Sequence, residues 1–318
     1  MSTTPPSTLP ELPGGLFNAP PDSVLVEDAD EEIMELYMNL EATTGRADSG
    51  GLGYLDATAA ELELSFELAP PAVQADTVKQ ARGKRAKPAK AITVDLTVVQ
   101  DPSALRARVG DTGSVLWRSS LYLARHLLTQ HHFPPASPLL DATRLASARV
   151  LELGAGTGVL AALMAPLCGD YVATDRAENL RLVQRNVSAN APKAGSSSSS
   201  SSKAATVAPL DWAEVAAEAG RKAKSGARYV PPESDTDLVI AVDCIYNESL
   251  VAPLVDTLAA LCARGALAWV VVELRSSDVH PAGFTVVRLG ESAMGAWEGE
   301  RGRWVGWVGW CPPVDERE

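Results

Sequence analysis

The sequence contains no pair of cysteines at a spacing typical of a metal or redox site. Its four cysteines are scattered, and three of them lie inside apolar runs: Cys168, Cys244, Cys262 and Cys311. We therefore interpret them as reduced thiols of a cytosolic protein. The four histidines are not spaced as metal ligands either, so the sequence predicts no metal site.

Acidic residues outnumber basic residues, and the chain has no long run of apolar residues. The chain has 28 Lys and Arg against 40 Asp and Glu, a formal net charge of −12. This balance argues against a non-specific grip on nucleic acid, which depends on neutralising phosphates. It is compatible with ordinary solubility and with a basic protein partner. No uncharged apolar run reaches about 18 residues, and the N-terminus lacks a basic start before an apolar core, so neither a transmembrane helix nor a secretory signal is predicted.

The composition changes along the chain divide it into three parts. Residues 1–30 are rich in proline and are predicted to be a disordered tail. Residues 31–110 are predicted to form a small α+β extension, with a basic run at 79–90 that is either a solvated linker or a nuclear-import or ribosome-contact tract. Residues 111–318 are predicted to form the main domain, interrupted by a poly-serine loop at 195–203.

The main domain shows the pattern of an α/β fold. Short apolar runs typical of strands alternate with amphipathic stretches typical of helices, which predicts a mainly parallel sheet covered on both faces. The first of these helices is expected to begin at Ser119 as its N-cap. Two strand-like runs close the chain and predict an antiparallel pair. In the last of them Trp304 and Trp310 are expected on one face and Trp307 on the other.

A glycine-rich loop follows the strand-like run that begins at Ala148. In "ELGAGTG" the glycines are Gly154, Gly156 and Gly158, and a helix-like stretch comes next. Such a loop lets the backbone approach a ligand at a helix N-terminus. Asp175 ends the following strand, where a carboxylate can accept both hydroxyls of a ribose. The loop therefore predicts an adenosine-containing ligand, and Val159, where the dinucleotide motif needs its third glycine, argues against a nicotinamide cofactor.

The G-x-G-x-G spacing, with Glu152 just before it, resembles the class I S-adenosylmethionine-dependent methyltransferases. Three further stretches resemble methyltransferase family 16: "GSVLWRSSLYLARHLL" at 113–128, "LDW" at 210–212 and "VDCIYN" at 242–247. Within that family, "LRSSDV" at 274–279 and the order of the N-terminal strands resemble the fungal ribosomal lysine N-methyltransferases, which modify the L1 stalk protein of the large subunit.

The resemblance implies a seven-stranded, mainly parallel Rossmann-like sheet with an antiparallel C-terminal hairpin. It implies a protein-lysine N-methyltransferase that uses S-adenosyl-L-methionine and acts on a ribosomal protein. We expect the protein in the cytoplasm or the nucleus, and we expect a monomer because the sequence shows no heptad repeat and no self-complementary stripe. Asp243 and Tyr246 would line the methyl-acceptor site. The residues implied in cofactor binding are Trp117, Glu152, Gly154, Ala155, Gly156, Asp175, Trp212 and Val242.

Five of the implied site residues also have a purely structural alternative. Asp175 and Asp243 are each followed by a helix that they could cap, while Tyr246, Trp117 and Trp212 are large enough to be core residues. Other functions stay open as well. They are methylation of a small molecule, a histidine or RNA (although "DCIY" replaces the N/D-P-P-Y/F motif of many RNA enzymes), a nicotinamide oxidoreductase, and an inactive scaffold.

One segment departs from the resembled family. Relatives carry a full helix between the fifth and sixth strands, whereas here residues 276–283 alone separate them and Pro281 would end any helix. This shortening bears on the wall of the acceptor site.

Overall fold

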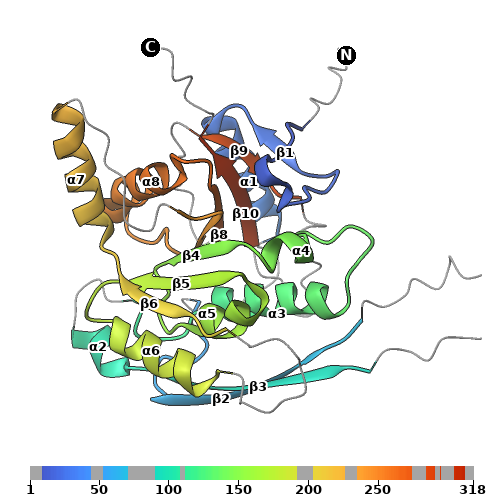
Figure 1. The fold of residues 1–318 in the computed structure, drawn as a ribbon, viewed down its shortest axis with the longest axis vertical. Coiled ribbons are helices and arrows are strands. Elements are labelled where there is room, and N and C mark those ends of the chain that lie inside the picture. The colour runs from blue at the N-terminus through green and yellow to red at the C-terminus, as the bar shows by residue number, and fades with distance from the viewer. Residues whose placement is uncertain are drawn as a thin grey trace, which may run out of the picture.

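The computed structural model describes residues 9–43, 53–70, 90–107, 112–191, 203–225, 235–273, 284–290, 294 and 304–311. Its centre is an eight-stranded sheet with helices on both faces, and a separate two-stranded sheet lies beneath it (Figure 1). Within the described residues, no helix combines the length and the apolar character that crossing a membrane requires. The poly-serine run, most of the basic run at 79–90 and the shortened segment 276–283 lie outside the described residues.

The large sheet has the strand order β1-β9-β10-β8-β7-β4-β5-β6. Its five strands from β8 to β6 are parallel to their neighbours, as the alternation of strands and helices predicts. They are β4 (Arg149–Leu153), β5 (Asp170–Asp175), β6 (Thr206–Pro209), β7 (Leu238–Val242) and β8 (Leu267–Glu273).

The predicted antiparallel edge is confirmed. The last strand, β10 (Trp304–Trp310), lies between β8 and β9 (Thr285–Arg288) and is antiparallel to both. One strand exceeds the predicted seven: β1 (Val24–Val26) pairs antiparallel with β9 and forms the edge of the sheet.

Helices cover the two faces of the sheet in two groups. The first group is α3 (Arg118–His132), α5 (Val159–Met164) and α6 (Leu180–Ala189), and the second is α1 (Ala29–Thr43), α7 (Trp212–Lys224) and α8 (Glu248–Cys262) (Figure 1). Successive residues of a strand point to opposite faces, so Val150 packs in the core on the first side and Leu151 in the core on the second. The remaining helical pieces are α2 (Pro102–Ala107), α4 (Ala142–Leu145) and the 3-10 turns Pro13–Gly15 and Ala165–Leu167.

The prediction of a disordered tail through residue 30 is wrong for residues 9–30. Leu12, Leu16 and Phe17 are buried in the main core, and the Phe17 ring meets Trp269 edge-on with 5.1 Å between ring centroids. The burial of these three apolar side chains holds the proline-rich segment against the main core. The segment therefore continues into β1 and α1, which belong to the main fold rather than to a separate extension.

The predicted strands near residues 62–68 and 91–100 form the two-stranded antiparallel sheet of β2 (Glu61–Leu68) and β3 (Ile92–Val99). Side-chain amides of α6 and of its C-cap residue hold it to the domain. Asn186 pairs with both the N–H and the C=O of Val99, each at 2.8 Å, and Asn190 does the same with Thr97 at 3.0 and 2.8 Å. The two asparagines thus satisfy alternate backbone groups of β3 much as a neighbouring strand would.

The tryptophans of β10 lie as predicted. Trp310 packs in the main core, on the face of the sheet that α3 covers, and Trp304 stacks on Tyr122 of α3 with 5.7 Å between ring centroids. Trp307 lies on the opposite face, in a cluster with Leu36 of α1. The strand is therefore covered on both sides, which explains its aromatic content without any ligand.

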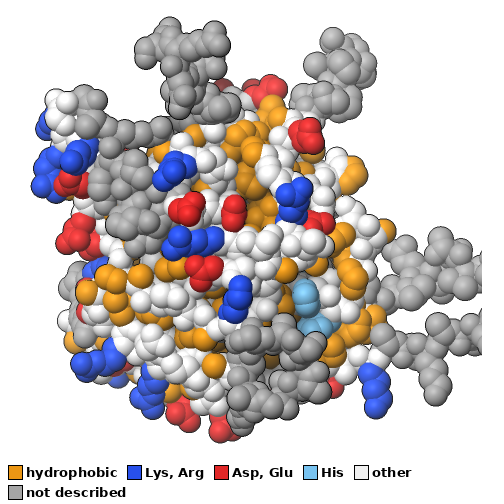
Figure 2. Space-filling model, in the orientation of Figure 1, with side chains coloured by type: hydrophobic (Ala, Val, Ile, Leu, Met, Phe, Trp, Pro, Cys, Tyr) orange, Lys and Arg blue, Asp and Glu red, His pale blue; other side chains and the backbone are white. Residues whose placement is uncertain are grey.

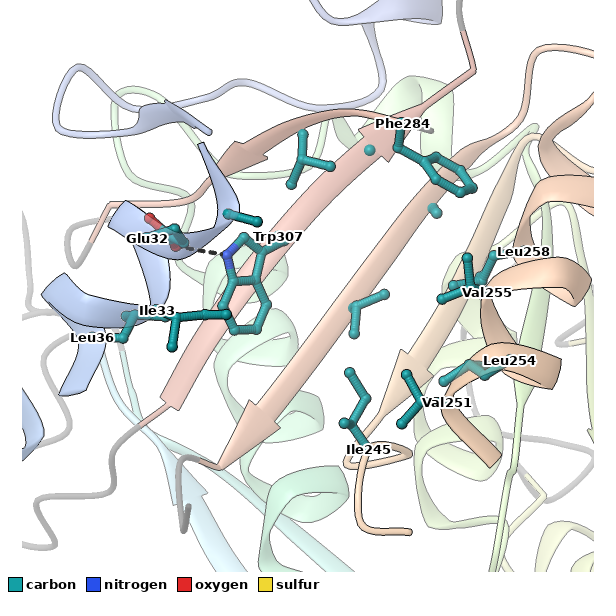
Figure 3. A pocket seen from close by; sticks show the side chains of 15 residues that line it. Glu32, Ile33, Leu36, Ile245, Val251, Leu254, Val255, Leu258, Phe284 and Trp307 are labelled. Atoms are coloured by element: carbon teal, nitrogen blue, oxygen red, sulfur yellow. Dashed lines mark hydrogen bonds between the residues drawn. The ribbon is translucent and has the colours of Figure 1, made fainter. Parts of the chain in front are cut away.

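An apolar pocket of about 90 Å³ lies between α1 and α8 over the antiparallel end of the sheet (Figure 3). Ile33 and Leu36 face it from one helix, and Leu254 and Leu258 from the other. Among the described residues that line it, Glu32 alone carries a charge.

Glu32 connects α1 to the sheet, and its loss should destabilise the protein. Its carboxylate accepts the Trp307 indole N–H at 2.9 Å and pairs with Arg288 at 3.0 Å (Figure 3). We expect Glu32→Ala to lower the free energy of unfolding by about 2–3 kcal/mol, because a buried indole N–H and a guanidinium lose this partner. Denaturant unfolding measures this, and Glu31→Ala, at an exposed neighbour, is the matched control. Equal stability of the two variants would contradict the assignment.

Candidate active site

The glycine loop connects β4 to α5 at the carboxyl edge of the parallel strands, where open α/β sheets bind ligands. Gly154, Gly156 and Gly158 all have positive φ angles, of 65°, 56° and 74°. Side chains at these positions would be strained, so glycine is required here by the backbone itself. The N–H of Ala155 is bound to the carbonyl oxygen of Thr174 on β5, which fixes the start of the loop.

The loop is packed closely by two side chains from other elements. A Cβ atom on Gly154 would lie 3.0 Å from the Cys244 sulfur and 3.2 Å from the Trp212 ring. Trp212 is the first residue of α7, and Cys244 follows β7, so the fold brings both to the loop. The position of Trp212 against the loop and its partial exposure argue against a plain core role. Cys244 was not singled out as a site residue by the sequence.

Asp175 lies at the end of β5 beside the loop. Its carboxylate accepts the Gly156 N–H at 2.8 Å, the Arg176 N–H at 2.7 Å and the Asn179 side-chain N–H at 3.2 Å. Burial raises the pKa of Asp175, and these hydrogen bonds act in the opposite direction. The helix-cap alternative is wrong, because α6 begins after Asn179 and Asp175 bonds the loop instead.

Besides Asp175, three of the sequence-predicted cofactor residues have buried side chains. Ala155 and Val242 are buried at the strand ends. Glu152 is 2 % exposed, and its carboxylate accepts the Tyr171 hydroxyl at 2.9 Å. Burial raises the pKa of Glu152 to about 8, the Tyr171 hydrogen bond lowers it, and the negative charge of Asp175 raises it further.

The raised pKa of Glu152 predicts a pH-dependent stability. The folded protein holds this proton up to about pH 8, whereas the ordinary pKa is 4.5. The folded state therefore binds the proton more tightly, and the free energy of unfolding should fall as the pH rises through this window. We expect Glu152→Gln, which is neutral at every pH, to gain stability over the wild type as the pH rises, by a few kcal/mol at the upper end. Urea unfolding from pH 5 to 8 measures this, and a stability difference independent of pH would contradict the assignment.

Asp243 follows β7 with a φ angle of 57°, the only non-glycine residue with positive φ in the described part of the chain. Such a conformation costs of order 1–3 kcal/mol and is concentrated at functional sites. Its carboxylate accepts the Ser119 hydroxyl at 3.1 Å and the Glu273 backbone N–H at 3.4 Å. The helix-cap alternative is wrong here too, because Asn247 caps α8.

Two aromatic residues complete the predicted set. Tyr246 is 42 % exposed, so it is not a core residue. Burial of its hydroxyl end raises its pKa, and a hydrogen bond with the Thr112 side chain lowers it. Trp117 is partly exposed, donates its indole N–H to the Thr112 carbonyl oxygen at 2.7 Å and meets the Tyr54 ring with 5.4 Å between centroids.

Trp117 also occupies the N-cap position of α3, so the expectation that Ser119 caps this helix is wrong. Ser119 lies inside the first turn and is 1 % exposed. Its neighbour Arg118 forms an ion pair with Glu273 at 3.1 Å. The first turn of α3 therefore contacts the ends of both β7 and β8, which the sequence alone did not reveal.

The chain is similar in sequence to several known proteins. A family model described as "Lysine methyltransferase" matches residues 102–284, more than half of the chain. One similar protein, the diaminohydroxyphosphoribosylamino-pyrimidine deaminase of Schizosaccharomyces pombe, is 31 % identical over 53 % of this chain and 35 % of its own length. The ribosomal lysine N-methyltransferase 5 of Eremothecium gossypii is 28 % identical over 64 % of this chain and 80 % of its own length.

The EEF1A lysine methyltransferase 3 of Mus musculus is 31 % identical over 40 % of this chain and 46 % of its own length, so the match spans less than half of two of these three relatives. A solved structure, a TehB-like SAM-dependent methyltransferase from Corynebacterium glutamicum, aligns with 61 % of this chain and 98 % of its own at 13 % identity and a TM-score of 0.34. On the match of the family model, the chain belongs to the lysine methyltransferase family.

Proposed function

We propose that this protein is an S-adenosylmethionine-dependent protein-lysine N-methyltransferase. One observation carries the proposal: the glycine loop, Asp175 and Asp243 meet at the carboxyl edge of one parallel sheet, inside the region that the family model matches. In this proposal the cofactor site and the acceptor site would lie side by side, as transfer between two bound molecules requires.

The residues at this edge fit the proposed cofactor. Gly154 and Gly156 hold the positive φ angles of the loop, and the buried carboxylate of Asp175 accepts the Gly156 N–H at 2.8 Å. Asp175 would accept the ribose hydroxyls, the loop would pass beneath the amino-acid end, and Trp212 would flank the adenine. Glu152, whose carboxyl group accepts a hydrogen bond from Tyr171, would stabilise the conformation of the glycine loop. When bound, the cofactor supplies an electrophilic methyl group on sulfur.

The chain's own residues would prepare the acceptor amine. A lysine amine reacts only when neutral, and its ordinary pKa is about 10.4. Partly dry surroundings favour the neutral form, and the exposed ring of Tyr246 would help to form such a wall. Asp243 would orient the amine through its carboxylate oxygens.

We propose a protein acceptor of basic character, in the cytoplasm or nucleus, with a ribosomal protein as the first candidate. The relative named ribosomal lysine N-methyltransferase 5 supports the ribosomal choice, and the relative named for EEF1A supports a translation factor instead. The net charge of −12 favours a basic protein. Figure 2 shows Lys and Arg side chains interspersed with Asp and Glu on the face in view, which does not favour nucleic acid as the acceptor. We propose that the enzyme works as a monomer.

A fractionation assay tests the choice of substrate. Purified protein is incubated with cofactor labelled in its methyl group and with a hypomethylated extract separated into ribosomal and soluble fractions. We expect a labelled band among the large-subunit proteins. Label in a soluble protein alone would retain methylation and reject the ribosomal substrate. Thermal stabilisation by NAD but not by S-adenosylhomocysteine would reject the methyltransferase proposal and favour an oxidoreductase.

A further inference from the structure

Three groups hold the backbone and carboxylate of Asp243, and they come from two elements, α3 and β8. The Asp243 N–H is bound to the Val271 carbonyl oxygen on β8 at 2.7 Å. The Ser119 hydroxyl, from the first turn of α3, donates to Oδ2 at 3.1 Å. The backbone N–H of Glu273, at the end of β8, approaches Oδ1 at 3.4 Å. Both carboxylate oxygens are therefore in contact with fixed donors.

The element that carries Ser119 is itself fixed to the same strand end. Arg118, the residue before it, forms an ion pair with the Glu273 side chain at 3.1 Å. The Glu273 side chain is 11 % exposed, so solvent screens this pair less than a fully exposed one. The backbone N–H of Glu273 contacts Asp243, and the Glu273 side chain contacts Arg118. Glu273 therefore connects Asp243 to the first turn of α3, which carries Ser119.

We infer that Ser119 is a positioning residue for methyl transfer, which holds the carboxylate of Asp243 in the orientation that receives the acceptor amine. The inference rests on the proposed function. Asp243 is buried and its backbone is in an unfavourable conformation, so its side-chain direction depends on such contacts. Ser119 is buried as well and does not cap α3, which leaves the bond to Asp243 as the role that the structure gives its hydroxyl.

The test compares Ser119→Ala with Ser119→Thr, because threonine keeps the hydroxyl. Methyl transfer is measured with the protein fraction that the wild type labels, at saturating cofactor and over a range of acceptor concentrations. We expect Ser119→Ala to lower kcat by about 10- to 100-fold, the value of a hydrogen bond to a charged group. Ser119→Thr should stay within about threefold of the wild type, since it retains that bond. Ser120→Ala, one position along the same helix, is the matched control and should retain wild-type kcat.

Cofactor affinity separates positioning from a general structural role. Calorimetric binding of S-adenosylhomocysteine should be equal in the wild type and in Ser119→Ala, because Ser119 contacts the acceptor side. Wild-type kcat in Ser119→Ala, equal losses in the Ala and Thr variants, or a parallel loss of cofactor binding would each overturn the inference. A wild-type protein that binds the cofactor analogue and labels no acceptor would instead overturn the proposed function, and the inference with it.

Discussion

Asp175→Ala should bind S-adenosylhomocysteine at least about 100-fold more weakly than the wild type, because charged hydrogen bonds to two ribose hydroxyls are lost together. The carboxylate also holds the loop, since it accepts the N–H of Gly156 and the amide of Asn179. Its removal therefore costs both a direct contact and the preorganisation of the loop. Isothermal titration calorimetry measures the affinity.

Asp170→Ala is the matched control for this experiment. Asp170 begins the same strand at its opposite end, and its side chain is 51 % exposed and paired with Arg149 at 3.3 Å. We expect its affinity for the cofactor analogue to remain at the wild-type value. If Asp175→Ala retained wild-type affinity while its thermal unfolding stayed normal, Asp175 would not be a cofactor residue.

Asn186→Ala should show the largest loss of stability of the substitutions considered. The side chain is fully buried and makes three hydrogen bonds of 2.8 Å, two with the backbone of Val99 and one with the Thr157 carbonyl oxygen. Water has no access to replace it, so three backbone groups lose their partner. We expect the free energy of unfolding to fall by about 4 kcal/mol, as measured by denaturant titration.

Two companion variants make this result specific. Gln184→Ala, on the exposed side of the same helix, should change stability by less than about 0.5 kcal/mol. Asn186→Asp keeps the acceptor for the Val99 N–H and loses both donors, so it should also be strongly destabilised. A loss for Asn186→Ala as small as that for Gln184→Ala would show that α6 does not hold β3 through this side chain.

Local patterns in the sequence predicted most of the main domain. Alternation and helical periodicity identified β4, α5, β5 and the strands after them, because those signals come from residues close together in the chain. The N-terminal strand could not be found in this way. Val24, Leu25 and Val26 pair with residues 286–288, and no local pattern states that a short apolar run after a proline-rich stretch joins a distant strand.

The residues of the candidate site also divide into those that a local sequence pattern predicts and those that it does not. Gly154, Gly156 and Asp175 could be predicted because a loop motif and a strand end specify them within one βαβ unit. Ser119 and Asn179 could not, since their roles depend on which strand ends the helices reach in the folded protein. Ser119 was expected to be a helix cap on propensity alone, and its tertiary contact with Asp243 explains why a buried serine stands there instead.

Analysis of the methylated amino acid tests the central claim most directly. Acceptor protein labelled by the purified enzyme is hydrolysed to free amino acids, and the labelled product is identified chromatographically, for the wild type and for Asp175→Ala in parallel. We predict that the label is N-methylated lysine with the wild type and that it is absent with the variant. Label in methylhistidine or in a non-protein acceptor, or no label from a wild type that binds the cofactor analogue, would contradict the assignment as a protein-lysine methyltransferase.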